Sequence, residues 1–117
     1  MTRLLIALAL IAACKKQEAK PQQTAPQMQM PAEEVKRSED ACKAYVERVC
    51  ACAANVPDAV RQCELSRALP EAVRIGLEVA ASPDSTPDIV QQSYTSVRKT
   101  AKECIEQTAK LPALGCP

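Results

Sequence analysis

Apolar residues recur at spacings of three and four along most of the chain after residue 33, which is the pattern of helices that bury one face. In the first predicted helix, Tyr45 and Val49 lie within about 60° of Cys42 when successive residues are placed about 100° apart. Ser38 is expected to cap the N-terminus of this helix, since a serine hydroxyl can accept a hydrogen bond from a free amide of the first turn. The pattern therefore predicts an amphipathic helix from Ser38 onward.

A second helix is expected to begin after the break at Asn55–Asp58 and to continue to about Ala81. Pro70 should kink this helix or divide it in two, because proline has no amide hydrogen and clashes with the preceding turn. Its inner side is formed by Val60, Cys63, Leu69, Val73, Leu77 and Ala80. Its outer side carries charges of alternating sign, which indicate a solvated face: Arg61, Glu64, Arg67, Glu71, Arg74 and Glu78.

A third helix should begin at Pro87, with Thr86 as its N-cap and proline at the first helical position. Its buried seam is predicted from residues at alternating spacings of four and three: Val90, Tyr94, Val97, Ala101, Cys104, Thr108 and Leu111. The last segment, Leu111–Pro117, contains Pro112 and Gly115 and should leave the helix. Three helices joined by short turns predict an all-α fold, an up-down-up three-helix bundle.

The first residues contain a short apolar run, Leu4–Ala13, which follows Arg3 and ends at Cys14. As a helix this run would cover about 15 Å, half of the roughly 30 Å hydrocarbon core of a bilayer. The pattern is typical of a secretory signal peptide, here predicted over residues 1–13. The end of the run, Ile11-Ala12-Ala13-Cys14, resembles the lipobox of bacterial lipoproteins, and the resemblance is confined to this leader.

The resemblance implies a lipid anchor at Cys14. In that family the cysteine sulfur receives a diacylglycerol, the signal peptide is removed before the cysteine, and the new amino group is usually acylated. Lys15 occupies the position at which aspartate tends to hold lipoproteins at the inner membrane, so the resemblance favours the outer membrane of the cell envelope. The alternative is an ordinary signal peptide that leaves Cys14 as a free thiol.

Residues 14–32 are predicted to form the lipidated terminus and a tether to the folded part. The segment is rich in Gln, Pro, Lys and Ala without an apolar period, which is typical of a disordered linker. A flexible coil of its length would reach on the order of 23 Å. Met28 and Met30 alone are weak evidence for a copper site, because no third soft ligand lies nearby. The folded domain is therefore expected over residues 33–117.

The composition argues against several functions. The chain has 15 Lys and Arg against 14 Asp and Glu, for a net charge of +1, which provides no electrostatic basis for binding nucleic acid. It contains no histidine, so His-based catalytic groups and mixed Cys/His zinc sites cannot be built. The carboxylates alternate with Arg and Lys on predicted solvated faces and offer no acid–base pair. We therefore expect no enzymatic activity and no cofactor.

The chain has seven cysteines and lacks Phe and Trp. A core of Ala, Val, Leu and Ile buries little area per residue, so disulfides are expected to stabilise the domain. Without Cys14 the count is even, and an exported domain with these cysteines predicts three disulfides: Cys42, Cys50, Cys52, Cys63, Cys104 and Cys116. Cys50 and Cys52 lie on opposite sides of the apolar face and should not bond to each other. One should pair with Cys63 and the other with Cys104, in either combination, which leaves Cys42 for Cys116. The last residues would then return about 15 Å along the bundle in an extended conformation, which about six residues can span.

These features favour a lipid-anchored protein of the cell envelope that presents a small cross-linked helical domain and acts by binding or structural contact. Its expected partners are the membrane and another envelope protein. The alternative is a periplasmic protein of thiol redox chemistry or soft-metal handling centred on Cys50 and Cys52, since a Cys-x-Cys pair can supply thiolates. Residues 33–117 carry no motif that resembles a known family.

Overall fold

The computed structural model describes residues 29–117, so the predicted signal peptide, Cys14 and Met28 lie outside the described residues. Within the described part the chain is all-helical, which confirms the all-α class that the sequence predicts. The elements are α2 (Ala32–Ala53), α3 (Pro57–Ser66), α4 (Ala68–Ala81), α5 (Pro87–Lys110) and the 3-10 helix η1 (Leu111–Leu114).

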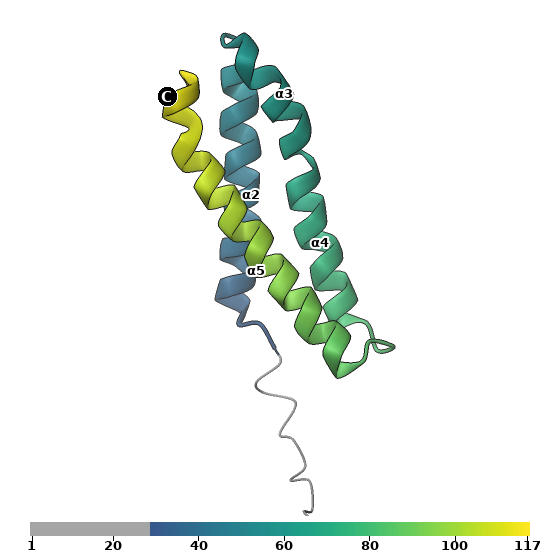
Figure 1. Ribbon diagram of the computed structural model, residues 1–117. Helices are drawn as coiled ribbons and strands as arrows, with labels where there is room; N and C mark the ends of the chain where they lie inside the picture. Colours follow the sequence, from purple (N-terminus) through teal and green to yellow (C-terminus); the bar gives the residue numbers. More distant parts are fainter. Residues whose placement is uncertain (1–28) are drawn as a thin grey trace, which may run out of the picture.

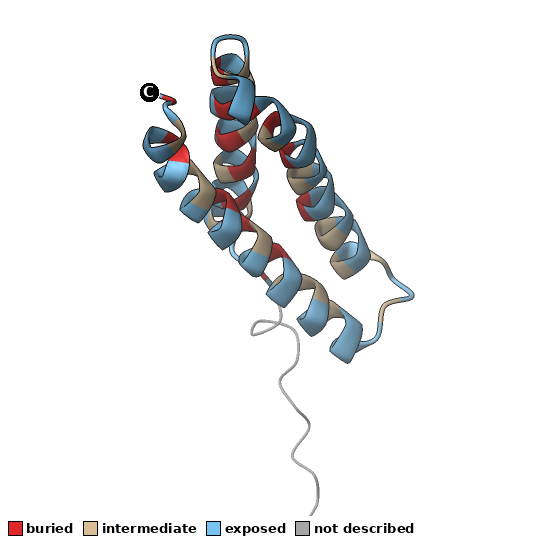
Figure 2. Ribbon diagram, turned by 45° about the horizontal axis from the view of Figure 1, so that its top comes forward, coloured by how far each residue is buried: buried red, intermediate tan, exposed pale blue. Residues whose placement is uncertain are grey.

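The helices pack side by side around one core. Figure 1 shows α3 and α4 following one another back along α2, and α5 crossing α2 so that the C-terminal residues lie near the end of α2. α5 packs against both α4 and α2, and α3 packs against α2. The buried residues lie on the faces that the helices turn toward one another (Figure 2). The largest fully buried side chains are Val49, Val73, Val97 and Leu111.

The first helix begins earlier than the sequence predicts, and Ser38 is not its N-cap. Pro31 holds that position, and its carbonyl oxygen accepts hydrogen bonds from the amides of Glu34 and Val35. Ser38 is buried inside α2, where its hydroxyl donates to the Glu34 carbonyl oxygen at 2.8 Å. Met30 also belongs to the core, so the packed part begins before the predicted boundary at residue 33.

The predicted division of the second helix at Pro70 is confirmed. α3 ends at Ser66, Arg67 links the two helices with helical backbone angles, and Pro70 falls in the first turn of α4. The expected inward position of Val60 is wrong, because its side chain is 46% exposed. Ala59 is buried in its place, since the inner face of this short helix is centred on Ala59, Cys63 and Ser66.

The third helix begins and ends where the sequence predicts. Thr86 caps α5, its Oγ1 accepting a hydrogen bond from the Ile89 amide at 3.4 Å, and Pro87 is the first helical residue. In the middle of the predicted seam, Val97 and Cys104 are buried. Beyond η1, Gly115 adopts a positive φ of 86°, a conformation that favours glycine and turns the chain toward α2.

An ion pair links the start of α2 to the middle of α5. The Arg98 guanidinium donates to both oxygens of Glu34, with Nε–Oε1 at 2.6 Å and Nη2–Oε2 at 3.1 Å. The hydrogen bond from Arg98 lowers the pKa of the Glu34 carboxyl. Because the folded-state pKa lies below the unfolded value of about 4.3, the pair stabilises the fold above that pH. This contribution is lost as the pH falls through the folded-state pKa.

Glu34→Gln should therefore lower the free energy of unfolding by about 0.5 kcal/mol near neutral pH, a small effect because the pair is partly solvated. The difference from the wild type should shrink toward zero in acid, where Glu34 is protonated in both states. Urea unfolding at neutral and acidic pH measures this difference, with Glu33→Gln in the same helical turn as the control. A Glu34→Gln deficit that stays constant with pH would contradict a role for the charged pair.

Candidate functional site

The six described cysteines form three disulfides, and each disulfide has one cysteine in α2. The sulfur–sulfur distances are 2.00, 2.01 and 1.99 Å for Cys42–Cys104, Cys50–Cys63 and Cys52–Cys116. α2 is thereby tied to α5, to α3 and to the residues after η1. α4 contains no cysteine and therefore takes part in no disulfide.

The favoured Cys42–Cys116 pairing is wrong. Cys42 lies opposite Cys104 because α5 crosses α2 at this level, and both cysteines are 0% exposed. The predicted extended return of the last residues to the start of α2 does not occur. η1 and Gly115 fold the chain back at once, with the Cys116 amide donating to the Leu111 carbonyl oxygen at 3.0 Å. Cys116 therefore reaches only the end of α2.

The pairing of Cys50, which the sequence left open, is with Cys63, and Cys52 takes Cys116 instead of Cys104. Cys50 is half-buried, and Arg67 Nη2 lies 3.9 Å from the Cys63 sulfur. As predicted, Cys50 and Cys52 are not bonded to each other. Arg67 thus places a cation beside the Cys50–Cys63 disulfide.

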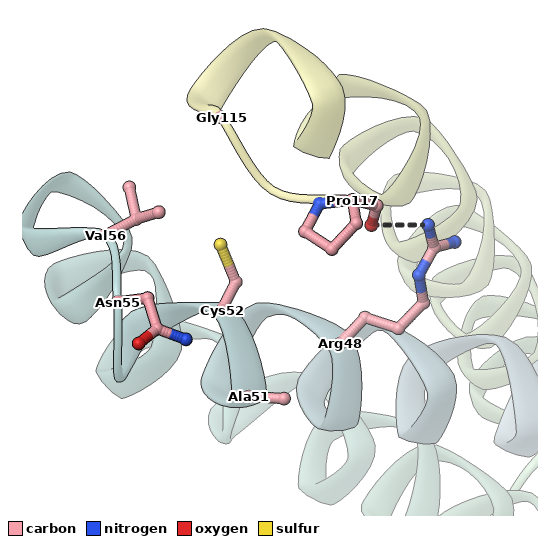
Figure 3. Close-up of a pocket in the computed structure, with 7 residues that line it drawn as sticks. All are labelled: Arg48, Ala51, Cys52, Asn55, Val56, Gly115 and Pro117. Atoms are coloured by element: carbon pink, nitrogen blue, oxygen red, sulfur yellow. Dashed lines mark hydrogen bonds between the residues drawn. The ribbon is translucent and has the colours of Figure 1, made fainter.

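A cavity of about 290 Å³ lies where the last residues meet the end of α2 (Figure 3). It is lined by Arg48, Ala51, Cys52, Asn55, Val56, Gly115 and Pro117. Arg48 Nη2 donates to the Pro117 carbonyl oxygen at 3.2 Å, and the Cys52 sulfur points toward the C-terminal segment. None of the lining side chains carries a carboxylate, a hydroxyl or a free thiol, so these side chains supply no acid, base or nucleophile for a reaction.

A larger apolar groove of about 530 Å³ lies between α4 and α5. It is lined by Ala72, Ile75, Gly76, Val79, Ile89, Gln92, Ser93 and Ser96. Three of its large side chains face solvent, with Ile75 47%, Val79 38% and Ile89 41% exposed. Exposed apolar side chains are ordinary when scattered singly, whereas these three lie together along one groove.

Gly76 lies in the lining of this groove, where α4 and α5 approach one another closely. A Cβ at this position would lie 2.6 Å from Cγ2 of Val97, which is buried and has no room to move. The glycine therefore lets α4 approach α5 closely. The predicted inner and outer stripes of the second helix left Ile75, Gly76 and Val79 unassigned. The sequence offered one indication of this groove, because Ile75 and Val79 are four residues apart and therefore lie on the same face of the helix.

The rest of the described chain presents little reactive chemistry. Residues 29–117 contain no group of three or more Cys, Asp or Glu placed to hold a metal ion. Met30, one of the two methionines considered for copper, is buried in the core. None of the helices described over this range is both long and apolar enough to cross a bilayer. Comparison of the chain with protein-family models, curated proteins and solved structures gives no match.

Proposed function

We propose that this chain is a lipid-anchored protein of the bacterial cell envelope, whose residues 29–117 form a non-catalytic binding module with up-down-up helices. The observation that carries the proposal is the division of the seven cysteines. Six of them are paired within the helical module. The seventh, Cys14, ends an apolar leader in a sequence that resembles a lipobox. Three permanent disulfides also suit an exported protein, since the cytosol keeps thiols reduced.

The proposed anchor is a set of acyl chains on Cys14. Two or more chains hold a protein stably at a bilayer, whereas a single chain binds marginally. The tether over residues 15–28 would then separate the module from the headgroups, and Lys15 favours the outer membrane in a host with two membranes. In this arrangement the folded part meets its partner in the aqueous phase near the membrane.

Binding is favoured over catalysis by the surfaces of the module. The groove between α4 and α5 is lined by aliphatic, small and amide side chains, which can bury apolar groups of a partner but transfer no proton. Among its carboxylates, Glu34 and Glu71 are engaged by arginines. The aliphatic groove and the arginine-paired carboxylates support a contact surface for another macromolecule.

The anchor is tested by Cys14→Ala. The wild-type protein should partition with the membrane fraction and into the detergent phase, whereas Cys14→Ala should lose the lipid and appear in the aqueous fraction after processing or remain as uncleaved precursor. Lys15→Asp is the matched control, because it keeps the lipidation residue and should stay membrane-bound. Incorporation of labelled fatty acid into the Cys14→Ala chain would reject lipidation at that residue.

A second candidate function, thiol–disulfide exchange, is favoured by one contact. Arg67 beside Cys63 would stabilise the thiolate that leaves when an external dithiol attacks Cys50. This candidate predicts that Cys50–Cys63 is reduced by mild dithiol while the helices persist. Circular dichroism, together with a count of the released thiols, distinguishes exchange from a structural role. If all three disulfides and the helices are lost together, the disulfides are purely structural.

A further inference from the structure

The α4–α5 groove has exposed apolar side chains from both helices. Ile75 and Val79 lie four residues apart on α4, and Ile89 continues the apolar surface on α5 where the two helices meet at their hairpin. Gly76 and Ser93 keep its floor free of bulk. An open apolar surface between two neighbouring helices, with three exposed aliphatic side chains, can accept the apolar face of a third helix.

The hairpin that carries the groove is uniformly acidic. From Ile75 to Val97 the chain contains three carboxylates, Glu78, Asp84 and Asp88, and no Lys or Arg. Glu78 and Asp88 each come one residue before an apolar residue of the groove, Val79 and Ile89, and are exposed.

The arginines nearest the hairpin in sequence are already paired. Arg74 is hydrogen-bonded to Glu71 and Glu78, and Arg98 to Glu34 on α2. Lys99 is the nearest lysine beyond Val97. Asp84 and Asp88 take part in none of the ion pairs of the described residues, so they give the end of the hairpin beside the groove its negative charge.

We propose that this groove binds a cationic amphipathic helix of a partner protein, with its apolar face between α4 and α5 and its Lys or Arg residues beside the acidic hairpin. Charge selects this occupant. A second copy of the chain would bring acidic hairpins together, and an anionic bilayer would be repelled in the same way. The proposal rests on the proposed function only in taking the module to be a binding domain, and it does not depend on lipidation.

The test uses the full chain, with its disulfides intact, in nanodiscs of zwitterionic lipid. Two labelled synthetic helices of about five turns serve as probes, both with leucine at spacings of three and four and with either lysine or glutamate elsewhere. Fluorescence anisotropy measures their affinity, and empty nanodiscs give the lipid background. The matched control variant is Ile105→Ser, because Ile105 is 61% exposed on α5 and lies outside the groove.

The Leu/Lys helix should bind, and the Leu/Glu helix should not. Ile75→Ser combined with Val79→Ser should weaken binding by about tenfold or more, while Ile105→Ser should stay within about twofold of the wild type. Asp84→Asn combined with Asp88→Asn should weaken binding several-fold and reduce its dependence on salt.

The combined Ile75→Ser and Val79→Ser substitutions are called the groove variant. The proposal is overturned if the groove variant and Ile105→Ser bind the Leu/Lys helix with equal affinity, or if the Leu/Glu helix binds the wild type as tightly as the Leu/Lys helix does. Self-association of the chain that the groove variant abolishes would identify a second copy as the occupant and also overturn it, as would binding to anionic vesicles that this variant abolishes. If the groove variant unfolds, amide shifts of the wild type decide. Shifts at Gly76 and Ser93 on adding the Leu/Lys helix support the site, and their absence overturns it. Membrane partitioning of Cys14→Ala is read separately, so failure of one proposal is distinguishable from failure of the other.

Discussion

Replacing Cys42 and Cys104 together by alanine should lower the free energy of unfolding by about 4 kcal/mol. The two cysteines are separated by 62 residues, and their disulfide restricts a large loop in the unfolded chain. Both are 0% exposed, so the change also removes sulfur atoms from the centre of the contact between α2 and α5. Urea unfolding without reductant, followed by circular dichroism, measures the loss.

Removal of Cys50 and Cys63 is the matched comparison. Their separation is 13 residues, for which the same loop argument gives about 3 kcal/mol. Cys50 is also half-buried, so less packing is lost. The structure thus predicts that removal of Cys42–Cys104 lowers the free energy of unfolding more than removal of Cys50–Cys63. If the Cys50–Cys63 double variant were the less stable of the two, the central position of Cys42–Cys104 would be contradicted.

Leu111→Ala should lower the free energy of unfolding by about 3 kcal/mol. Leu111 is the largest of the fully buried side chains, at 0% exposed, and it lies at the point where α5 passes into η1. Its carbonyl oxygen accepts the Cys116 amide, so the same residue positions the turn that carries Cys116 to Cys52. Truncation leaves a cavity in the core, and the lost contacts and the cavity both lower the stability of the fold.

Leu65→Ala controls for the loss of a leucine as such. Leu65 is 59% exposed on α3, and its truncation should change the unfolding free energy by less than about 0.5 kcal/mol. Both variants are compared with the wild type by urea unfolding, with their disulfides verified by mass. Equal effects of the two substitutions would mean that Leu111 does not occupy the core.

Local signals were sufficient to predict much of the fold. Thr86 followed by Pro87 begins α5 as expected, and Pro70 divides the second helix, because capping and the missing proline amide act within one turn. The seam of α5 was predicted correctly around Val97 and Cys104, since a spacing of three and four fixes which residues share a face.

Features that depend on how the helices cross, such as the disulfide pairing, could not be predicted from local sequence signals. The favoured Cys42–Cys116 pairing assumed an extended return of the C-terminal residues, whereas η1 and Gly115 fold them back beside Cys52. Ser38 has the residue type of an N-cap but is buried in α2, because Glu34 and its neighbours already form a turn before it. Competing local signals of similar strength are decided by tertiary packing.

The candidate groove was only partly visible in the sequence. Ile75 and Val79 could be recognised as apolar residues beside the charged stripe. Their joining with Ile89 requires the close approach of α4 and α5 that Gly76 allows. The acidic residues of the hairpin can be recognised in the sequence, but only the structure places them beside an apolar groove.

The division of the seven cysteines is tested most directly by mass spectrometry of the protein from its own membrane fraction, alkylated before and after reduction. The account predicts no reactive thiol before reduction and six after it, with non-reduced peptides joined as Cys42–Cys104, Cys50–Cys63 and Cys52–Cys116. Cys14 should resist alkylation in both states and carry the added mass of its lipid. A Cys14 that alkylates freely, or that is found in a disulfide, would contradict the account.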